Sequence, residues 1–244
     1  MMVDSSAHPE QAVSDIVQSA FNSAGQRCSA LRVLFLQEDI VPRMIPLLAG
    51  AMQELCIGDP SLLSTDMGPV INMAAMAQLN KHVDYLDQVG QLIYQVELPD
   101  RLTSGNFFAP RIYEIPELKL LDKEVFGPIL HVVRFKANQL DDVIETVNQS
   151  GYGLTLGIHS RIDATIKHIC ARAKVGNVYV NRNMIGAVVG VQPFGGQGLS
   201  GTGPKAGGHF YLHRFASEQT LSNNISAIGG NTQLLAMEEG EFLL

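Results

Sequence analysis

Residues 25–36 read GQRCSALRVLFL, and two elements of regular structure are predicted to meet within this stretch. Upstream, apolar residues recur at helical spacing over residues 9–24, and Gly25 marks the end of that helix. Downstream, the apolar run over 31–36 is typical of a strand that is buried on both faces. A helix-to-strand junction of this kind exposes a side chain at the end of a sheet, where α/β proteins place their chemistry. Cys28 occupies that position.

The rest of the chain alternates between amphipathic segments and short apolar runs. Further helices are predicted over 43–54, between a cap at Asn72 and a stop at Gly90, after a cap at Asn138, and over 163–173. Further strands are predicted over 107–115, 129–135, 154–159 and 177–180. Pro46 is compatible with its helix only near the first turn, because proline lacks a backbone N–H. This alternation predicts an α/β fold with an open, mostly parallel sheet flanked by helices.

The composition excludes several classes of protein. The net charge of −7 and the scattered basic residues argue against a nucleic-acid-binding surface. No apolar stretch is long enough to span a bilayer, and the first ten residues do not resemble a signal peptide, so we expect a cytoplasmic protein. The three cysteines form no CxxC pair, and we expect the seven histidines to form neither HxxxH nor HExxH, which argues against disulfides and a bound metal. Cys56 and Cys170 are interpreted as ordinary core cysteines.

Cys28 is the candidate nucleophile. Gly25 lets the backbone turn, and the small residues Ser29 and Ala30 leave room for a substrate to approach the thiol. Arg27 can favour the thiolate electrostatically, although adjacent residues need not face each other. The alternative is that Cys28 is a buried core residue, as most single cysteines are.

Three motifs together resemble the aldehyde dehydrogenase superfamily. Residues 25–28 match its G-Q-x-C nucleophile motif, residues 123–128 (KEVFGP) match E-x-F-G-P, and residues 193–196 (PFGG) with 200–201 match a third motif. They occur in the family's order and at its distances. Segments 155–161 and 186–194 resemble the L-glutamate γ-semialdehyde (1-pyrroline-5-carboxylate) dehydrogenases, and segments 181–185 and 229–231 resemble the C-terminal part of bifunctional proline-utilisation members.

The resemblance implies roles for individual residues. Cys28 would attack the aldehyde of a small-molecule semialdehyde, giving a thiohemiacetal and then a thioester, with NAD as the cofactor. Glu124 matches the residue that holds a ribose of NAD, and Phe126 matches an aromatic residue beside the nicotinamide. Five residues match positions that bind the carboxylate or the methylene groups of the substrate, namely Ser29, Gly207, Gly208, Phe215 and Phe194.

The resemblance also implies parts that are expected before Met1. These are the family's general base in an E-x-G-G segment, an asparagine of the oxyanion site and the dinucleotide-binding domain. FAD would belong only to the proline dehydrogenase domain of a bifunctional parent. Residues 1–216 would form the thiol-bearing catalytic domain, and 217–244 a tail with an edge strand that pairs between subunits of a homo-oligomer. We therefore expect little or no dehydrogenase activity from the chain alone.

Residues 196–201 also fit G-x-G-x-x-G, the pattern of a dinucleotide-binding turn. That site needs a strand before it and a helix at its end, whereas Pro193 precedes these residues and Gly203-Pro204 follows them. We interpret them as a substrate loop. Two alternatives to the semialdehyde dehydrogenase remain, a non-catalytic oligomerisation or binding fragment and a CoA-acylating aldehyde dehydrogenase.

Overall fold

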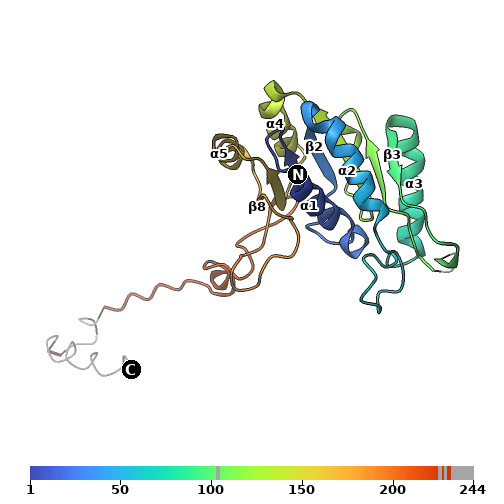
Figure 1. Ribbon diagram of the computed structural model, residues 1–244. Coiled ribbons are helices and arrows are strands. Elements are labelled where there is room, and N and C mark those ends of the chain that lie inside the picture. The colour runs from blue at the N-terminus through green and yellow to red at the C-terminus, as the bar shows by residue number, and fades with distance from the viewer. Residues whose placement is uncertain (103–104, 225–226, 228–229, 232–244) are drawn as a thin grey trace. The chain divides into compact units, whose positions relative to one another are not determined.

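The computed structural model describes residues 1–102, 105–224, 227, 230 and 231 (Figure 1). The chain divides into two compact units, Met1–Gly208 and His209–Leu244. The first unit is built on a seven-stranded sheet in the order β3-β4-β5-β2-β1-β7-β8, and a separate pair joins β6 to β9. The strands are β1 Met2–Val3, β2 Val33–Gln37, β3 Gln91–Gln95, β4 Arg111–Glu114, β5 Ile129–Phe135, β6 Tyr152–Gly153, β7 Thr155–His159, β8 Asn177–Val180 and β9 Gln197–Gly198.

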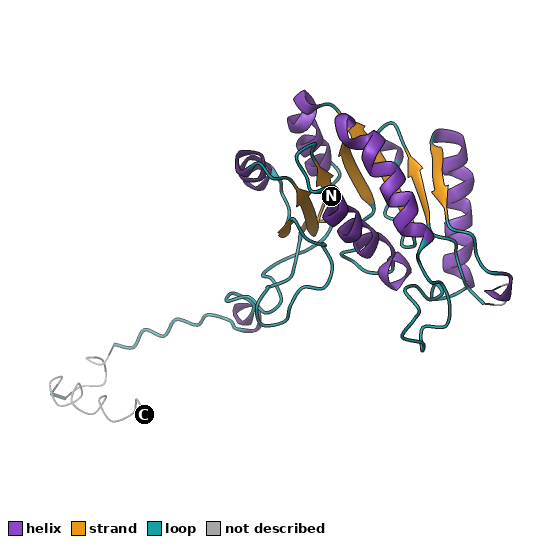
Figure 2. Cartoon of the chain, in the orientation of Figure 1, coloured by secondary structure: helices purple, strands orange, loops and turns teal. Residues whose placement is uncertain are grey.

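Helices lie on both faces of this sheet (Figure 2). They are α1 Pro9–Phe21, α2 Val41–Gln53, α3 Met73–Val89, α4 Leu140–Gln149 and α5 Asp163–Arg172. The 3₁₀ turns are η1 Asn22–Gly25, η2 Glu38–Ile40, η3 Asp100–Leu102, η4 Leu118–Leu120, η5 Ala137–Gln139 and η6 Leu212–Phe215. Adjacent strands of the large sheet are parallel except β3 and β4, which are antiparallel. The predicted α/β fold with a mostly parallel sheet flanked by helices is confirmed.

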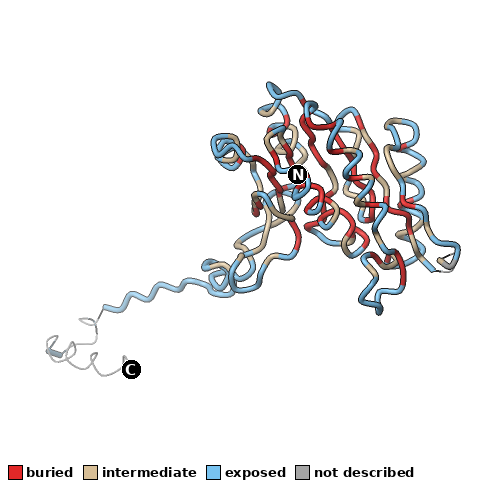
Figure 3. Tube along the Cα trace, in the orientation of Figure 1, coloured by how far each residue is buried: buried red, intermediate tan, exposed pale blue. Residues whose placement is uncertain are grey.

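The core lies between the sheet and these helices (Figure 3). Strand β2 is central, and its register against β5 runs from Val33 opposite His131 to Gln37 opposite Phe135. Helices α1 and α2 pack side by side across one face. On α1 the apolar residues at helical spacing, such as Ile16 and Ala20, are buried, as amphipathic periodicity predicts.

Strand β1 was not predicted from the sequence, yet it joins the two halves of the sheet. Met2 pairs with Phe35 of β2 and with Ile158 of β7. Two apolar residues followed by polar ones carry no periodic signal, because a strand pattern needs several alternating positions. The edge strand β3 was missed as well, since most of its side chains are at least partly exposed.

Several predicted boundaries shift. α2 begins at Val41 rather than at 43. Pro46 therefore lies in the second turn of the helix, where its missing N–H removes one helical hydrogen bond. The expectation that Pro46 is tolerated only near the first turn is wrong. Asn138 does not cap α4 but lies within η5. The turn there is closed instead by Lys136, whose N–H donates to Gln139 Oε1 at 2.9 Å. The strand predicted over 107–115 is regular only over β4, because Pro110 cannot donate to a ladder.

The predicted tail strand falls largely outside the described residues. Residues 217–224 are described without regular structure, and 225–226, 228–229 and 232–244 are not described. The expected domain boundary after 216 stays a prediction. In the part of the chain that the structure describes, no helix is long and apolar enough to cross a membrane.

Candidate active site around Cys28

An unusual backbone precedes Cys28. After α1 ends, the three successive residues Ser23, Ala24 and Gly25 have φ angles of 56°, 52° and 64°. Left-handed angles cost residues with a side chain about 1–2 kcal/mol each. The chain therefore reverses sharply between α1 and β2, and this reversal presents Cys28 at the surface.

Cys28 lies in a tight turn whose ends are held together. The Ala30 N–H donates to Arg27 O at 3.1 Å, which makes Cys28 and Ser29 the central residues of the turn. The Cys28 side chain is exposed, so the interpretation as a buried core cysteine does not hold. Ser29 is only 5 % exposed. Cys56 and Cys170, interpreted as core residues, are also exposed.

The nucleophile motif touches the E-x-F-G-P motif through two glycines. A Cβ at Gly25 would lie 2.2 Å from Gly127 O, and a Cβ at Gly127 would lie 2.3 Å from Leu79 Cδ2. Gly127 also has a positive φ, of 154°. These residues, about a hundred positions apart in the sequence, can approach this closely because Gly25 lacks a side chain, while the missing side chain of Gly127 leaves room for Leu79.

Arg32 connects these two motifs, and the sequence analysis did not identify it. Its Nη1 donates to Gly25 O at 2.6 Å and its Nη2 donates to Arg27 O at 3.0 Å. Its Nε lies 3.4 Å from Glu124 Oε1. Its Cζ lies 4.5 Å from the centroid of the Phe126 ring, a cation–π contact.

The charge near the thiol therefore comes from Arg32. Burial lowers the pKa of Arg32, and the negative charges of Glu124 and of a Cys28 thiolate oppose that shift. A guanidinium stays protonated in proteins, so the charge persists. Arg27, the cation suggested by the sequence, is exposed and donates from its Nε to Ser23 Oγ at 2.9 Å.

Gln26 anchors the turn to a neighbouring loop. Its Oε1 accepts from the Ile71 N–H at 2.8 Å, and its Nε2 donates to Ser23 O at 3.1 Å and to Pro69 O at 3.5 Å. A side-chain amide carries both a donor and an acceptor, which this position requires.

Cys28 opens onto a cavity of about 390 Å³ on the sheet face between α3 and α4. Glu124, His82, His131 and Ser200 are among its polar lining residues. Ser29, Phe126, Phe194, Gly207 and Gly208 are not among the residues that line it. Cys28 and Glu124 are therefore the two predicted site residues that this cavity brings together.

The buried His131 and the half-buried His82 contact each other in the cavity wall. His131 Nδ1 lies 2.8 Å from Arg32 O, and its Nε2 lies 2.8 Å from His82 Nε2. Because a carbonyl only accepts, Nδ1 of His131 carries its proton, and His82 donates to the unprotonated Nε2. Burial lowers the pKa of His131 to about 3 and lowers the pKa of His82, so both rings are neutral at pH 7.

The glycine-rich segment forms a second cluster. Phe194 and Ala206 exchange backbone hydrogen bonds of 3.1 and 2.9 Å, which brings Phe194 beside Gly207 and Gly208. The Gly208 N–H donates to Lys205 O at 3.0 Å, closing a turn. Gly207 has φ of 73°, with open space where a Cβ would be. Phe215 belongs to the second unit and is exposed.

The G-x-G-x-x-G pattern at 196–201 does not have the structure of a dinucleotide turn. The two-residue strand β9 lies inside it, and none of the described helices begins at its end. The expectation that the histidines form no HxxxH pattern is wrong, because His209 and His213 have this spacing. Among the described residues, however, no group of three or more His, Cys, Asp or Glu could hold a metal ion.

Comparison with known families places this geometry in context. A model described as the aldehyde dehydrogenase family matches residues 1–221.

The chain belongs to the aldehyde dehydrogenase family. It is 54 % identical over 227 residues to the bifunctional protein PutA of Escherichia coli (strain K12), covering 91 % of this chain and 17 % of that protein. It is 36 % identical over 224 residues to the 1-pyrroline-5-carboxylate dehydrogenase of Geobacillus thermodenitrificans, covering 91 % of this chain and 43 % of that protein. The chain thus spans less than half the length of these relatives.

Solved structures of the aldehyde dehydrogenase family agree with the fold. A crystal structure of bifunctional proline utilization A (PutA) superposes with a TM-score of 0.87 at 55 % identity, covering 93 % of this chain and 23 % of that chain. The 1-pyrroline-5-carboxylate dehydrogenase from Thermus with bound NAD gives a TM-score of 0.81 at 33 % identity, covering 88 % and 41 %. The resemblance inferred from the three motifs is therefore confirmed.

Proposed function

We propose that this chain is the thiol-bearing part of an enzyme that oxidises L-glutamate γ-semialdehyde to L-glutamate with NAD⁺ in proline catabolism. The observation that supports this most is that Cys28 and Glu124 line one cavity in an aldehyde dehydrogenase chain. The relatives called PutA and 1-pyrroline-5-carboxylate dehydrogenase point to the substrate. We place the enzyme in the cytoplasm and expect it to be a homo-oligomer.

The chemistry begins at Cys28. Its thiolate attacks the aldehyde carbon, forming a C–S bond while the carbonyl oxygen takes the negative charge, which the Cys28 backbone N–H helps to stabilise. NAD⁺, when bound, accepts the hydride that leaves this carbon. Water then cleaves the resulting thioester, releasing the carboxylate and restoring the thiol. Among the described residues none hydrogen-bonds to Cys28 Sγ, so the base that activates this water is expected from the family's E-x-G-G segment.

Glu124 and Phe126 fit the nicotinamide-ribose end of NAD. The Glu124 side chain is 28 % exposed and faces the cavity beside Cys28, where its oxygens can accept from a diol. Phe126 is 45 % exposed, which leaves ring surface available for a contact. The described residues contain no phosphate-binding turn, so the rest of the cofactor would be held elsewhere in the parent protein.

The substrate's α-carboxylate would bind at the glycine-rich cluster. Gly207, with its open left-handed turn, is the better-placed donor. The Gly208 N–H already donates to Lys205 O, so this turn would have to open for Gly208 to contribute. Ser29 is buried and would need to turn toward the substrate, while Phe194 is proposed to flank its methylene groups. The same role for Phe215, which belongs to the second unit, stays a prediction.

A chimeric enzyme tests the proposal. In the Geobacillus thermodenitrificans 1-pyrroline-5-carboxylate dehydrogenase, the region that matches this chain would be replaced by this chain, and the residues before that region would be kept. NADH formation from L-glutamate γ-semialdehyde would then be followed. We expect turnover that falls at least about a thousandfold in Cys28→Ala, because the covalent route is lost. The matched variant Cys56→Ala, which removes another exposed thiol, should retain turnover. Equal activity in the two variants would contradict the role of Cys28.

The 244-residue chain alone should form no NADH under the same conditions. The part of the chain that the structure describes contains neither a phosphate-binding turn nor a base that hydrogen-bonds to the Cys28 thiol. If the purified chain produces NADH and this activity depends on Cys28, the expectation that the base and the rest of the NAD site lie elsewhere in the parent protein is wrong.

A further inference from the structure

We propose that Arg32 is a positioning residue that links the state of Glu124 to the reactivity of Cys28. One cation holds the turn that carries the thiol and at the same time pairs with the carboxylate across the cavity mouth. A ligand that engages Glu124 would thereby make Cys28 more reactive. The identity of that ligand as a ribose diol rests on the proposed function, whereas the link itself rests on contacts within this chain.

Two hydrogen bonds from Arg32 position the turn that carries Cys28. Arg32 donates to Gly25 O at 2.6 Å and to Arg27 O at 3.0 Å, on the two residues that border Gln26 just before Cys28. The planar guanidinium can make both contacts at once, and a lysine ammonium has no such fixed fork. The Arg32 side chain is 13 % exposed, so these contacts lie in a poorly hydrated environment.

The positive charge of Arg32 acts on both Glu124 and Cys28, and this gives the electrostatic link between them. Arg32 Nε lies 3.4 Å from Glu124 Oε1 but makes no hydrogen bond there, and Nε is buried without a partner. The Glu124 side chain is 28 % exposed, so a ligand can reach it while it pairs with Arg32. The same guanidinium interacts electrostatically with Cys28. When Glu124 accepts hydrogen bonds from a ligand, less of the Arg32 charge is neutralised and more of it stabilises the thiolate.

This model can be tested without substrate or NAD. Purified 244-residue variants would be alkylated with iodoacetamide at constant neutral pH, and the rate at Cys28 would be measured by peptide mass spectrometry. The exposed thiols Cys56 and Cys170 provide internal references in the same sample. Glu124→Gln removes the competing carboxylate charge and so imitates a Glu124 that is engaged by a ligand.

A double-mutant cycle gives the decisive comparison. We expect Glu124→Gln to accelerate Cys28 alkylation about threefold and Arg32→Met to slow it about three- to tenfold, since thiolate population follows local charge. In the Arg32→Met background, Glu124→Gln should have no effect. An equal acceleration in both backgrounds would mean that Glu124 acts directly on the thiol, and the proposal would be wrong.

Two further variants separate this model from a loss of structure. Arg32→Lys keeps the charge but not the fork, so the Glu124→Gln acceleration should largely persist there. Arg27→Gln removes the adjacent exposed cation, and the acceleration should persist unchanged. Loss of the acceleration in Arg32→Lys, or its loss in Arg27→Gln, would overturn the assignment. Because no turnover is measured, failure here would leave the NADH test of the proposed function unaffected.

Discussion

At the scale of single residues, the site depends on the absence of side chains as much as on their presence. Gly25 allows the turn before Cys28 to touch the Gly127 carbonyl, and Arg32 contacts both this turn and Glu124. The Cys28 sulfur itself makes no hydrogen bond with the described residues. Its position is set by the backbone around it, so the sensitive positions should be its neighbours.

We predict that Gly25→Ala lowers the free energy of unfolding by about 3 kcal/mol, combining left-handed strain with a backbone overlap. A Cβ there would lie 2.2 Å from Gly127 O, and a carbonyl in a packed loop cannot move aside cheaply. Urea denaturation followed by circular dichroism measures this. Gly50→Ala is the matched control, because Gly50 lies in α2 with nothing within 4 Å of its Cβ position. That variant should be about 0.5–1 kcal/mol more stable, and two losses of equal size would contradict the packing argument.

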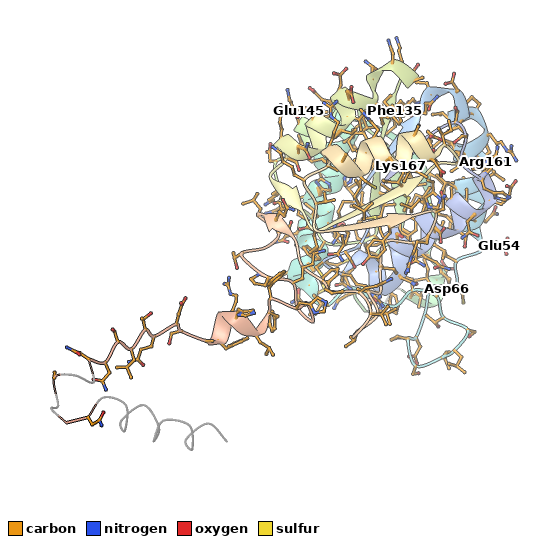
Figure 4. The ribbon with its side chains drawn as sticks, turned by 90° about the vertical axis from the view of Figure 1, so that its left-hand side faces the viewer. Glu54, Asp66, Phe135, Glu145, Arg161 and Lys167 are labelled. Atoms are coloured by element: carbon orange, nitrogen blue, oxygen red, sulfur yellow. The ribbon has the colours of Figure 1, made fainter. Side chains whose placement is uncertain are left out.

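At the scale of elements, the start of helix α3 affects the position of residues in the site. Asn72 begins α3 as predicted, with its Oδ1 accepting from the Ala75 N–H at 2.9 Å. α3 in turn supplies Leu79 beneath Gly127 and His82 in the cavity wall, so the helix start fixes part of the site. Figure 4 labels two exposed residues of the later helices, Glu145 of α4 and Lys167 of α5.

Asn72→Ala should destabilise the chain by about 1 kcal/mol, because an N–H at the start of α3 loses its acceptor. Thermal unfolding followed by far-ultraviolet circular dichroism measures the change in stability. Asn72→Asp keeps the acceptor and should retain most of the stability. If alanine and aspartate behave alike, the cap does not stabilise α3.

At the scale of the whole molecule, buried groups that are uncharged at neutral pH make the fold sensitive to acid. Burial lowers the pKa of His131 to about 3, and burial also lowers the pKa values of His82 and His159. In each case the unfolded chain takes up protons more readily than the folded chain. Stability is therefore complete above the unfolded pKa and falls as the pH drops toward the folded pKa.

We predict that the free energy of unfolding falls steadily between pH 7 and pH 4. His131 alone should contribute a loss on the order of 2 kcal/mol by pH 5, from the gap between 6.5 and about 3. Denaturant midpoints at several pH values measure this slope. His131→Gln should be less stable at pH 7 but show a shallower slope, whereas His209→Gln, on an exposed residue, should keep the original slope. A slope that is unchanged by His131→Gln would exclude this histidine as its source.

The sequence alone determined the α/β class, the helices, most of the longer strands and Cys28 as the candidate nucleophile, because helical periodicity, apolar runs and the G-Q-x-C motif are local signals. β5 and β8 begin and end where the pattern predicts. What only the tertiary structure decided depends on residues far apart in the chain. β1 is a strand because β2 and β7 pair with it, and Arg32 matters because Gly25, Arg27, Glu124 and Phe126 converge on it. No local pattern records such convergence, since hydrogen bonds and ion pairs depend on distances in space that folding creates.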